Sequence, residues 1–124
     1  QRPAQGKKPD TASRMRPAET PELTRVIMER LGESVRLEDV AAQLGESPTA
    51  LSHRMRRKHG MSFSEYVNRL RMDRAKELLR RTRLSVTEIA QRVGVADQSN
   101  FGKLFKRFET MTPLEYRAQF GRKR

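Results

Sequence analysis

The sequence predicts an all-α fold of about seven helices, arranged as two helix-turn-helix subdomains joined by a long linking helix. Three observations predict this fold. Helix start and stop signals follow one another from residue 20 onward, no segment alternates apolar and polar residues over the length of a strand, and part of the chain repeats itself. The subdomains are expected at 20–61 and 82–124, with the linking helix at 62–81.

Residues 1–19 differ in composition from the remainder of the chain. They hold three prolines, one glycine, five basic residues and almost nothing apolar. Such a segment cannot bury enough apolar surface to offset its loss of conformational entropy, so we expect a flexible tail or linker. The alternative is a basic arm that touches DNA.

The first subdomain is expected to contain three helices. The first spans 20–32, the second 37–44 and the third 48–59. Gly45 and Gly60 follow the last two, as expected of glycines that end helices in a left-handed conformation.

The linking helix begins with a capping box formed by Ser62 and Glu65, and it reaches about Arg80. Its apolar residues predict one stripe along the helix: Phe63, Tyr66, Val67, Leu70, Leu78 and Leu79.

Three further helices are expected in the second subdomain. Ser85 and Glu88 form a second capping box, which opens a helix that ends at Gly94. Asp97 is placed to cap a helix over about 98–108. A third capping box, at 112–115, opens the last helix.

The internal repeat is the most informative feature of the sequence. With an offset of 49 residues, Val40–Gly45 falls on Ile89–Gly94; beyond the glycine the offset becomes 50 and stays there. Each unit is a short helix, a glycine turn and a second helix of about three turns, which is the layout of a helix-turn-helix. A helical bundle with accidental self-similarity is the alternative. The shared exit motif M-[ST]-x-x-E-Y and the matched glycines argue against it.

The second helix of each unit is expected to leave one face free. Leu51 and Met55, like Phe101 and Phe105, are four residues apart and therefore project from one side into the core. The opposite faces combine short hydrogen-bonding side chains with cations, as base readout beside phosphate binding requires. A merely solvated basic face is the other interpretation. The exposed positions are Thr49, Ser52, His53 and Arg56 in the first unit, and Gln98, Ser99, Gly102, Lys103 and Lys106 in the second.

Charge and composition narrow the class of partner. Lys and Arg number 27 against 15 acids, giving a net charge of +12, which predicts a nucleic acid or an anionic membrane surface. The sequence has no cysteine, which excludes disulfides, thiolate metal sites and cysteine nucleophiles. No apolar run approaches the roughly 18–20 residues of a membrane span, and the start does not resemble a signal peptide. A cytoplasmic location is therefore expected, and of the two partner classes we expect the nucleic acid and no membrane.

The second unit and the linking helix resemble a known family. Residues 88–117 read E-I-A-Q-R-V-G-V-A-D-Q-S-N-F-G-K-L-F-K-R-F-E-T-M-T-P-L-E-Y-R, and residues 70–79 read L-R-M-D-R-A-K-E-L-L. Over about 24–120 the chain resembles the DNA-binding domain of AraC/XylS-type transcription regulators. The resemblance implies sequence-specific binding of two adjacent major-groove segments of double-stranded DNA. It also implies transcription regulation, mostly activation, with RNA polymerase as a partner and an effector or sensor domain elsewhere in the full-length chain.

The resemblance also assigns roles to residues. Carried over position by position, the base-reading sites are Thr49, Ser52, His53, Gln98, Ser99, Gly102 and Lys103. The cations beside them are expected to contact phosphates: Arg56, Arg57, Lys106 and Arg107. Three positions depart from the family pattern. Val95 replaces a phenylalanine, Thr110 replaces a glycine, and Arg36 stands where the second unit has its cap Ser85, which puts local stability in doubt.

The sequence also bears on other classes of function. An enzyme is disfavoured because the sequence has no paired acids, no nucleophile with its base and no glycine-rich phosphate loop. We expect no catalytic residue, cofactor or metal; His53 and His59 are six residues apart and lie on different helix faces. A non-specific architectural or RNA-binding protein and a protein-docking domain remain open. Tyr66 and Tyr116 are expected to be packing residues at equivalent corners.

Overall fold

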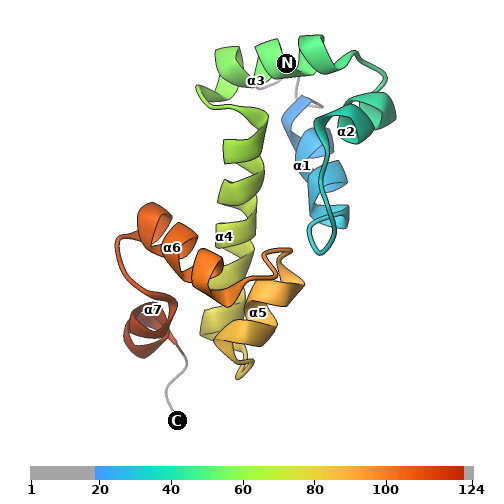
Figure 1. Ribbon diagram of the computed structural model, residues 1–124. Helices are drawn as coiled ribbons and strands as arrows, with labels where there is room; N and C mark the ends of the chain where they lie inside the picture. Colours follow the sequence, from blue (N-terminus) through green and yellow to red (C-terminus); the bar gives the residue numbers. More distant parts are fainter. Residues whose placement is uncertain (1–18, 122–124) are drawn as a thin grey trace, which may run out of the picture.

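The computed structural model describes residues 19–121, and in that range it consists of seven helices without a strand (Figure 1). The all-α architecture expected from the sequence is confirmed. The expected tail at 1–19 lies, apart from Glu19, outside the described residues. The helices are α1 (Glu19–Glu29), α2 (Leu37–Leu44), α3 (Pro48–His59), α4 (Phe63–Arg81), α5 (Val86–Arg92), α6 (Gln98–Glu109) and α7 (Pro113–Phe120).

The long helix α4 carries a group of three helices near each end. Figure 1 shows α1, α2 and α3 around its beginning, and α5, α6 and α7 around its second half. Each group encloses its own hydrophobic core. The first core is formed by Leu23, Val26, Ile27, Leu31, Val40, Ala41, Leu51, Met55, Phe63, Tyr66 and Val67. The second is formed by Met72, Ala75, Leu78, Leu79, Ile89, Ala90, Val93, Phe101, Phe105 and Tyr116.

The apolar residues of α4 do not form one stripe, so that expectation is wrong. Phe63, Tyr66 and Val67 belong to the first core, whereas Leu78 and Leu79 belong to the second together with residues that the stripe omitted. At about 100° per residue, the two apolar patches point in directions roughly 140° apart around the helix axis. The helix serves two cores on different sides, and a single-stripe pattern cannot describe that arrangement.

The helix ends follow the local signals in the sequence closely. All three expected capping boxes are present, and the Asp97 side chain accepts from the Ser99 and Asn100 amides. Arg36 precedes α2 without any side-chain cap, as expected. The end of α1 differs from the expectation, because the α-helix stops at Glu29 and not at residue 32. From Arg30 the chain forms a tighter turn, in which the Arg30 amide donates to the Ile27 carbonyl three residues back at 3.0 Å.

Helix α7 fastens the end of α4. The Arg117 guanidinium donates from Nε to the Leu79 carbonyl and from Nη2 to the Thr82 carbonyl, both at 3.1 Å. These carbonyls lie at a helix end, where they lack intrahelical partners. Tyr116 beside it is buried, as the packing interpretation predicts, and its hydroxyl accepts from Arg80 at 3.0 Å. Between residues 19 and 121 no helix is both long and apolar enough to cross a bilayer.

Candidate nucleic-acid interface

Two equivalent turns set the direction of α3 and α6. Gly45 and Gly94 both have positive φ, 76° and 91°, which an L side chain opposes. After each turn a side-chain cap opens the next helix: the Ser47 hydroxyl accepts from the Ala50 amide, and Asp97 caps α6. Both helices therefore follow a glycine with positive φ and a side-chain cap, although the second turn is one residue longer, and the repeat seen in the sequence is also a structural repeat.

The inner faces of α3 and α6 are fixed by their core residues. Leu51, Met55, Phe101 and Phe105 are all fully buried, as the four-residue spacing predicts. Their burial turns the other side of each helix to solvent. Thr49, His53, Arg56 and Arg57 are exposed on α3, where Ser52 is half-buried; Gln98, Ser99, Lys103, Lys106 and Arg107 are exposed on α6, where Gly102 is half-buried. The structure thus places the candidate residues of α3 on one accessible face. On α6 they spread over a wider arc, because Gln98 and Arg107 are nine residues apart and therefore lie on opposite sides of the helix axis, with Gly102, Lys103 and Lys106 between them.

The face of α3 contains no acidic residue. It offers a threonine and a serine hydroxyl and one imidazole, with cations following along the helix. Arg54 is turned aside: its Nη2 lies 2.7 Å from Glu46 Oε2, and both side chains are mostly buried. This ion pair ties α3 to the preceding turn and fixes the position of the exposed face.

On α6 the Gln98 side chain is held by a neighbouring helix. The Thr87 hydroxyl of α5 donates to Gln98 Oε1, which leaves the Gln98 amide NH₂ as the free donor of this side chain. Gly102 follows on the same side, and a Cβ there would meet nothing within 4 Å. The fold itself therefore does not require a glycine at 102.

His59 lies away from the exposed face of α3. Its ring centroid is 4.8 Å from that of Tyr66, so this last residue of α3 packs against α4. Burial lowers the pKa of His59, and the positive charges of Arg54 and Lys58 lower it further. The sequence indicated only that His59 suits the end of a helix. Its contact with Tyr66 could be seen only in the structure.

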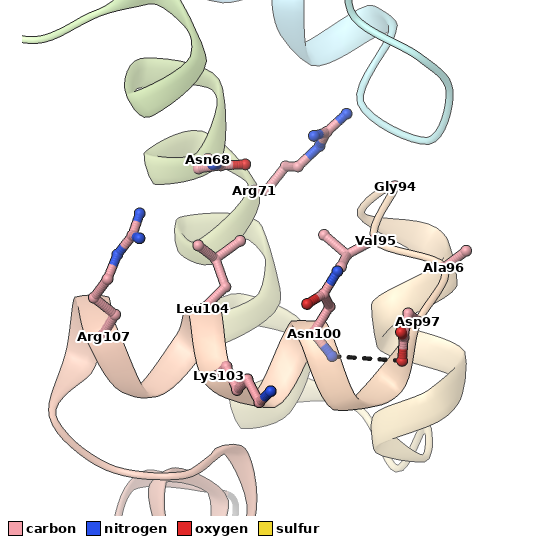
Figure 2. A pocket seen from close by; sticks show the side chains of 10 residues that line it. All are labelled: Asn68, Arg71, Gly94, Val95, Ala96, Asp97, Asn100, Lys103, Leu104 and Arg107. Carbon is pink, nitrogen blue, oxygen red and sulfur yellow. Dashed lines mark hydrogen bonds between the residues drawn. The ribbon is translucent and has the colours of Figure 1, made fainter.

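A hollow of about 530 Å³ adjoins the exposed face of α6, on the side that faces α4 (Figure 2). Asn100, Lys103 and Arg107 line it from α6, and Asn68 and Arg71 line it from α4. The sequence analysis did not identify this hollow or the residues Asn68, Arg71 and Asn100 in its lining. The i, i+3, i+7 spacing of Asn100, Lys103 and Arg107 could have indicated that these polar residues share one side of α6. No local pattern indicates that the middle of α4 faces the same hollow.

The exposed face of α6 continues toward α4 through Phe108. The guanidinium carbons of Arg107 and Arg69 lie 5.5 and 5.2 Å from the centre of this ring, within the range of cation–π attraction. Arg107 therefore extends the row of cations on α6 along a partly fixed direction. Its expected role as a phosphate contact stays a prediction.

A family model described as a helix-turn-helix domain matches residues 40–119. Among curated proteins, the HTH-type transcriptional activator RhaS of Escherichia coli O1:K1 is 35% identical over 89 residues. That match covers 72% of this chain and 32% of RhaS. The matched segment spans about a third of the length of RhaS and of several other curated relatives.

Solved structures give the same result. The C-terminal domain of AraT, a response regulator from Geobacillus stearothermophilus, is similar with a TM-score of 0.78 and 33% identity, over 90% of this chain and 92% of that domain. The DNA-binding domain of the global transcriptional factor AdpA, solved in complex with a target DNA, gives a TM-score of 0.73 at 27% identity, over 81% of this chain and 90% of that one.

Proposed function

This chain belongs to the AraC/XylS-type helix-turn-helix family, and we propose that it is the part of a transcription regulator that binds double-stranded DNA in a sequence-specific manner. The observation that carries the proposal is the repeated unit. Each unit buries one side of its second helix completely and leaves the other side exposed, polar and basic. We call α3 and α6 the recognition helices from here on.

The chemistry of the two exposed faces supports direct reading of bases. Hydroxyl, imidazole, amide and ammonium groups can hydrogen-bond to base edges in the major groove, and a helix fits that groove. The base-contacting residues of this proposal are Thr49, Ser52, His53, Gln98, Ser99, Gly102 and Lys103. Neighbouring cations supply the contacts to the sugar–phosphate backbone, which position the protein without reading sequence. These are Arg56, Arg57, Lys106 and Arg107.

Selection of bound fragments from a random DNA pool tests this proposal. We expect enrichment of one site with two unlike parts, because the two recognition faces carry different residues. A pool that stays random after several rounds would contradict sequence-specific binding.

Non-specific architectural binding is the second candidate, and the net charge of +12 is the observation that favours it. Affinity for the selected site, measured with and without an excess of random DNA, separates the two candidates. A sequence reader keeps most of its binding under competition. An architectural protein loses it in proportion to the competitor.

The function of the longer protein is a further proposal. Since the relatives are about three times as long as the matched segment, an effector or sensor domain is expected elsewhere in the full-length chain, which would work in the cytoplasm. Activation of transcription is proposed because the relative RhaS is named an activator, and RNA polymerase is the partner that the family resemblance implies. Transcription in vitro from a promoter that contains the selected site, with and without this chain, tests for activation.

A further inference from the structure

The two cores of the molecule meet at one residue of α4. The last α4 side chain that packs on the first core is Leu70, and the first side chain of the second core is Met72. Arg71 lies between them along the helix. At about 100° per residue it also lies between the two apolar patches around the helix axis. It is therefore the α4 residue best placed to touch both units.

The Arg71 side chain reaches across to the turn that follows α1. Its Nη2 donates to the Glu33 carbonyl at 3.1 Å, a contact 38 residues apart in sequence. The guanidinium is half-buried, and its Nε is fully buried without a hydrogen-bond partner among the described residues. Burial lowers the pKa of Arg71, because the charged form loses hydration. Burying a charge in this way costs free energy. We therefore ask which function of Arg71 outweighs this cost in stability.

Gly94 completes the contact from the second unit. A Cβ on Gly94 would overlap the Leu31 carbonyl oxygen and would come within 3.1 Å of Arg71 Nε. The absence of a side chain at 94 therefore lets the turn after α5 approach both the turn after α1 and the guanidinium. Figure 2 shows Arg71 extending from α4 toward the first unit, with Gly94 at the edge of the same hollow.

The equivalent glycine in the first unit makes no such contact. Gly45 has the same backbone conformation, with φ of 76° against 91°, but nothing lies within 4 Å of the position of its Cβ. The turn geometry explains both glycines, and only Gly94 is additionally needed for contact between the units.

The turn after α1 also lies close to the end of α5, because a Cβ on Gly32 would come within 3.4 Å of the Arg92 carbonyl oxygen. The hollow of about 530 Å³ lies on one side of Arg71, and a second of about 520 Å³, lined by Gly32, Val35 and Gln91 among others, lies on the other. Arg71 and Gly94 line both hollows. Arg71 and the turn at Gly94 therefore lie where the two units and both hollows meet.

We propose that Arg71, seated between the Leu31–Glu33 turn and Gly94, is a positioning residue that fixes the orientation of the first unit relative to the second. We call this arrangement the coupling contact. It keeps α3 and α6 at one separation and angle, although each unit folds around its own core. The consequence for DNA rests on the proposed function: a fixed orientation favours sites whose two segments have one particular spacing.

A distance measurement tests the coupling contact without any DNA. The sequence has no cysteine, so Asp39→Cys in α2 and Ala118→Cys in α7, both exposed, can carry the only two spin labels. With Arg71 intact, pulsed electron–electron double resonance is expected to give one narrow distribution of the distance between the two labels. Arg71→Ala should broaden or shift it. Arg74→Ala, which removes an exposed arginine of the same helix, should leave it unchanged.

The glycine pair supplies a second comparison that is independent of charge. Gly94→Ala and Gly45→Ala impose similar backbone strain, but only the first blocks the contact between the units. Gly94→Ala should alter the distance distribution and Gly45→Ala should not. Circular dichroism checks that each variant keeps its helices, and Arg71→Lys offers a milder change should Arg71→Ala unfold. Unchanged distributions in the folded Arg71 and Gly94 variants would overturn the proposal.

DNA binding then separates this inference from the proposed function. Arg71→Ala should weaken binding to the two-segment site by at least on the order of tenfold, and should leave binding to a single segment unchanged. An equal loss on both DNAs would mean that Arg71 touches DNA itself, which overturns the positioning role. Failure of the parent chain to bind any DNA selectively would overturn the proposed function, while the distance measurements would still decide the coupling contact.

Discussion

Thr110 adopts the same left-handed backbone conformation as Gly60, its counterpart one repeat earlier. φ is 64° at Thr110 and 67° at Gly60, and each residue ends a recognition helix. Both amides bond a carbonyl four residues back, at Arg56 and Lys106. Within residues 19–121 no other non-glycine residue has positive φ. The second unit therefore keeps the helix ending of the first and accepts strain at a β-branched residue.

Replacing Thr110 by glycine should stabilise the protein. Relief of the strain raises the free energy of unfolding, partly offset by the larger entropy of the unfolded chain, so the net gain is up to about 1 kcal/mol. Urea unfolding measures it. The matched reverse change, Gly60→Thr, should destabilise by about 1–2 kcal/mol. A lower unfolding midpoint for Thr110→Gly would show that the Thr110 hydroxyl, which donates to the Glu109 carbonyl, is worth more than the strain.

Gly102→Ala separates protein stability from DNA affinity. Because a Cβ at this helical position meets nothing within 4 Å, the substitution should raise the free energy of unfolding by about 1 kcal/mol through helix propensity. It should lower the affinity for the selected site if DNA approaches the helix closely there. Thermal unfolding and a binding titration on the same preparation check both. An unchanged affinity would remove Gly102 from the contact set.

Acidification should destabilise the first unit through His59. Its pKa in the folded state lies below the ordinary value of 6.5, so the unfolded chain binds the proton more readily. The stabilisation is complete above pH 6.5 and is lost as the pH falls through the lowered pKa. His59→Gln should flatten the fall in unfolding midpoint over this window. His53→Gln, at the exposed histidine of the same helix, is the control and should leave the fall in place; equal effects of both variants would refute the assignment.

Most of the fold was predictable because its signals are local. Capping boxes such as Ser62 with Glu65 act within one turn, and core pairs such as Phe101 and Phe105 follow from helical spacing. The two-sided use of α4 was not predictable in this way. Whether Met72 belongs to a different core from Leu70 depends on how distant helices pack, which a single-helix pattern does not contain.

The candidate site likewise has a part that local patterns predict and a part that they do not. The exposed faces of α3 and α6 could be predicted because each is the complement of a buried face. The Thr87–Gln98 bond and the seat of Arg71 join segments that are distant in sequence or on separate helices, so they required the structure. The roles assigned to individual residues toward DNA remain predictions.

Base-reading and phosphate-binding residues should respond differently to substitution. Gln98→Ala or His53→Ala should cost about 1–3 kcal/mol on the selected site and relax the preference at particular base pairs. Lys106→Ala should weaken binding to all sequences and reduce the salt dependence of the affinity by about one unit in slope. Binding titrations at several salt concentrations, on the selected site and on single-base variants, check both. If all these variants lose affinity uniformly across sequences, the faces bind DNA without reading it.

The spacing of the target tests most directly whether both recognition helices read one DNA molecule. The 19 residues of α4 span roughly 28 Å, and we predict that α3 and α6 enter major-groove segments about one DNA turn, near 34 Å, apart. Insertion of about five base pairs between the two segments moves the second groove to the wrong side of the duplex, and insertion of a full turn restores the side but not the distance. The affinity of this chain as a monomer for both inserted sites is predicted to fall to that of a single segment. Normal binding to the full-turn insertion, or indifference to both insertions, would contradict a rigid reader with two inserted helices.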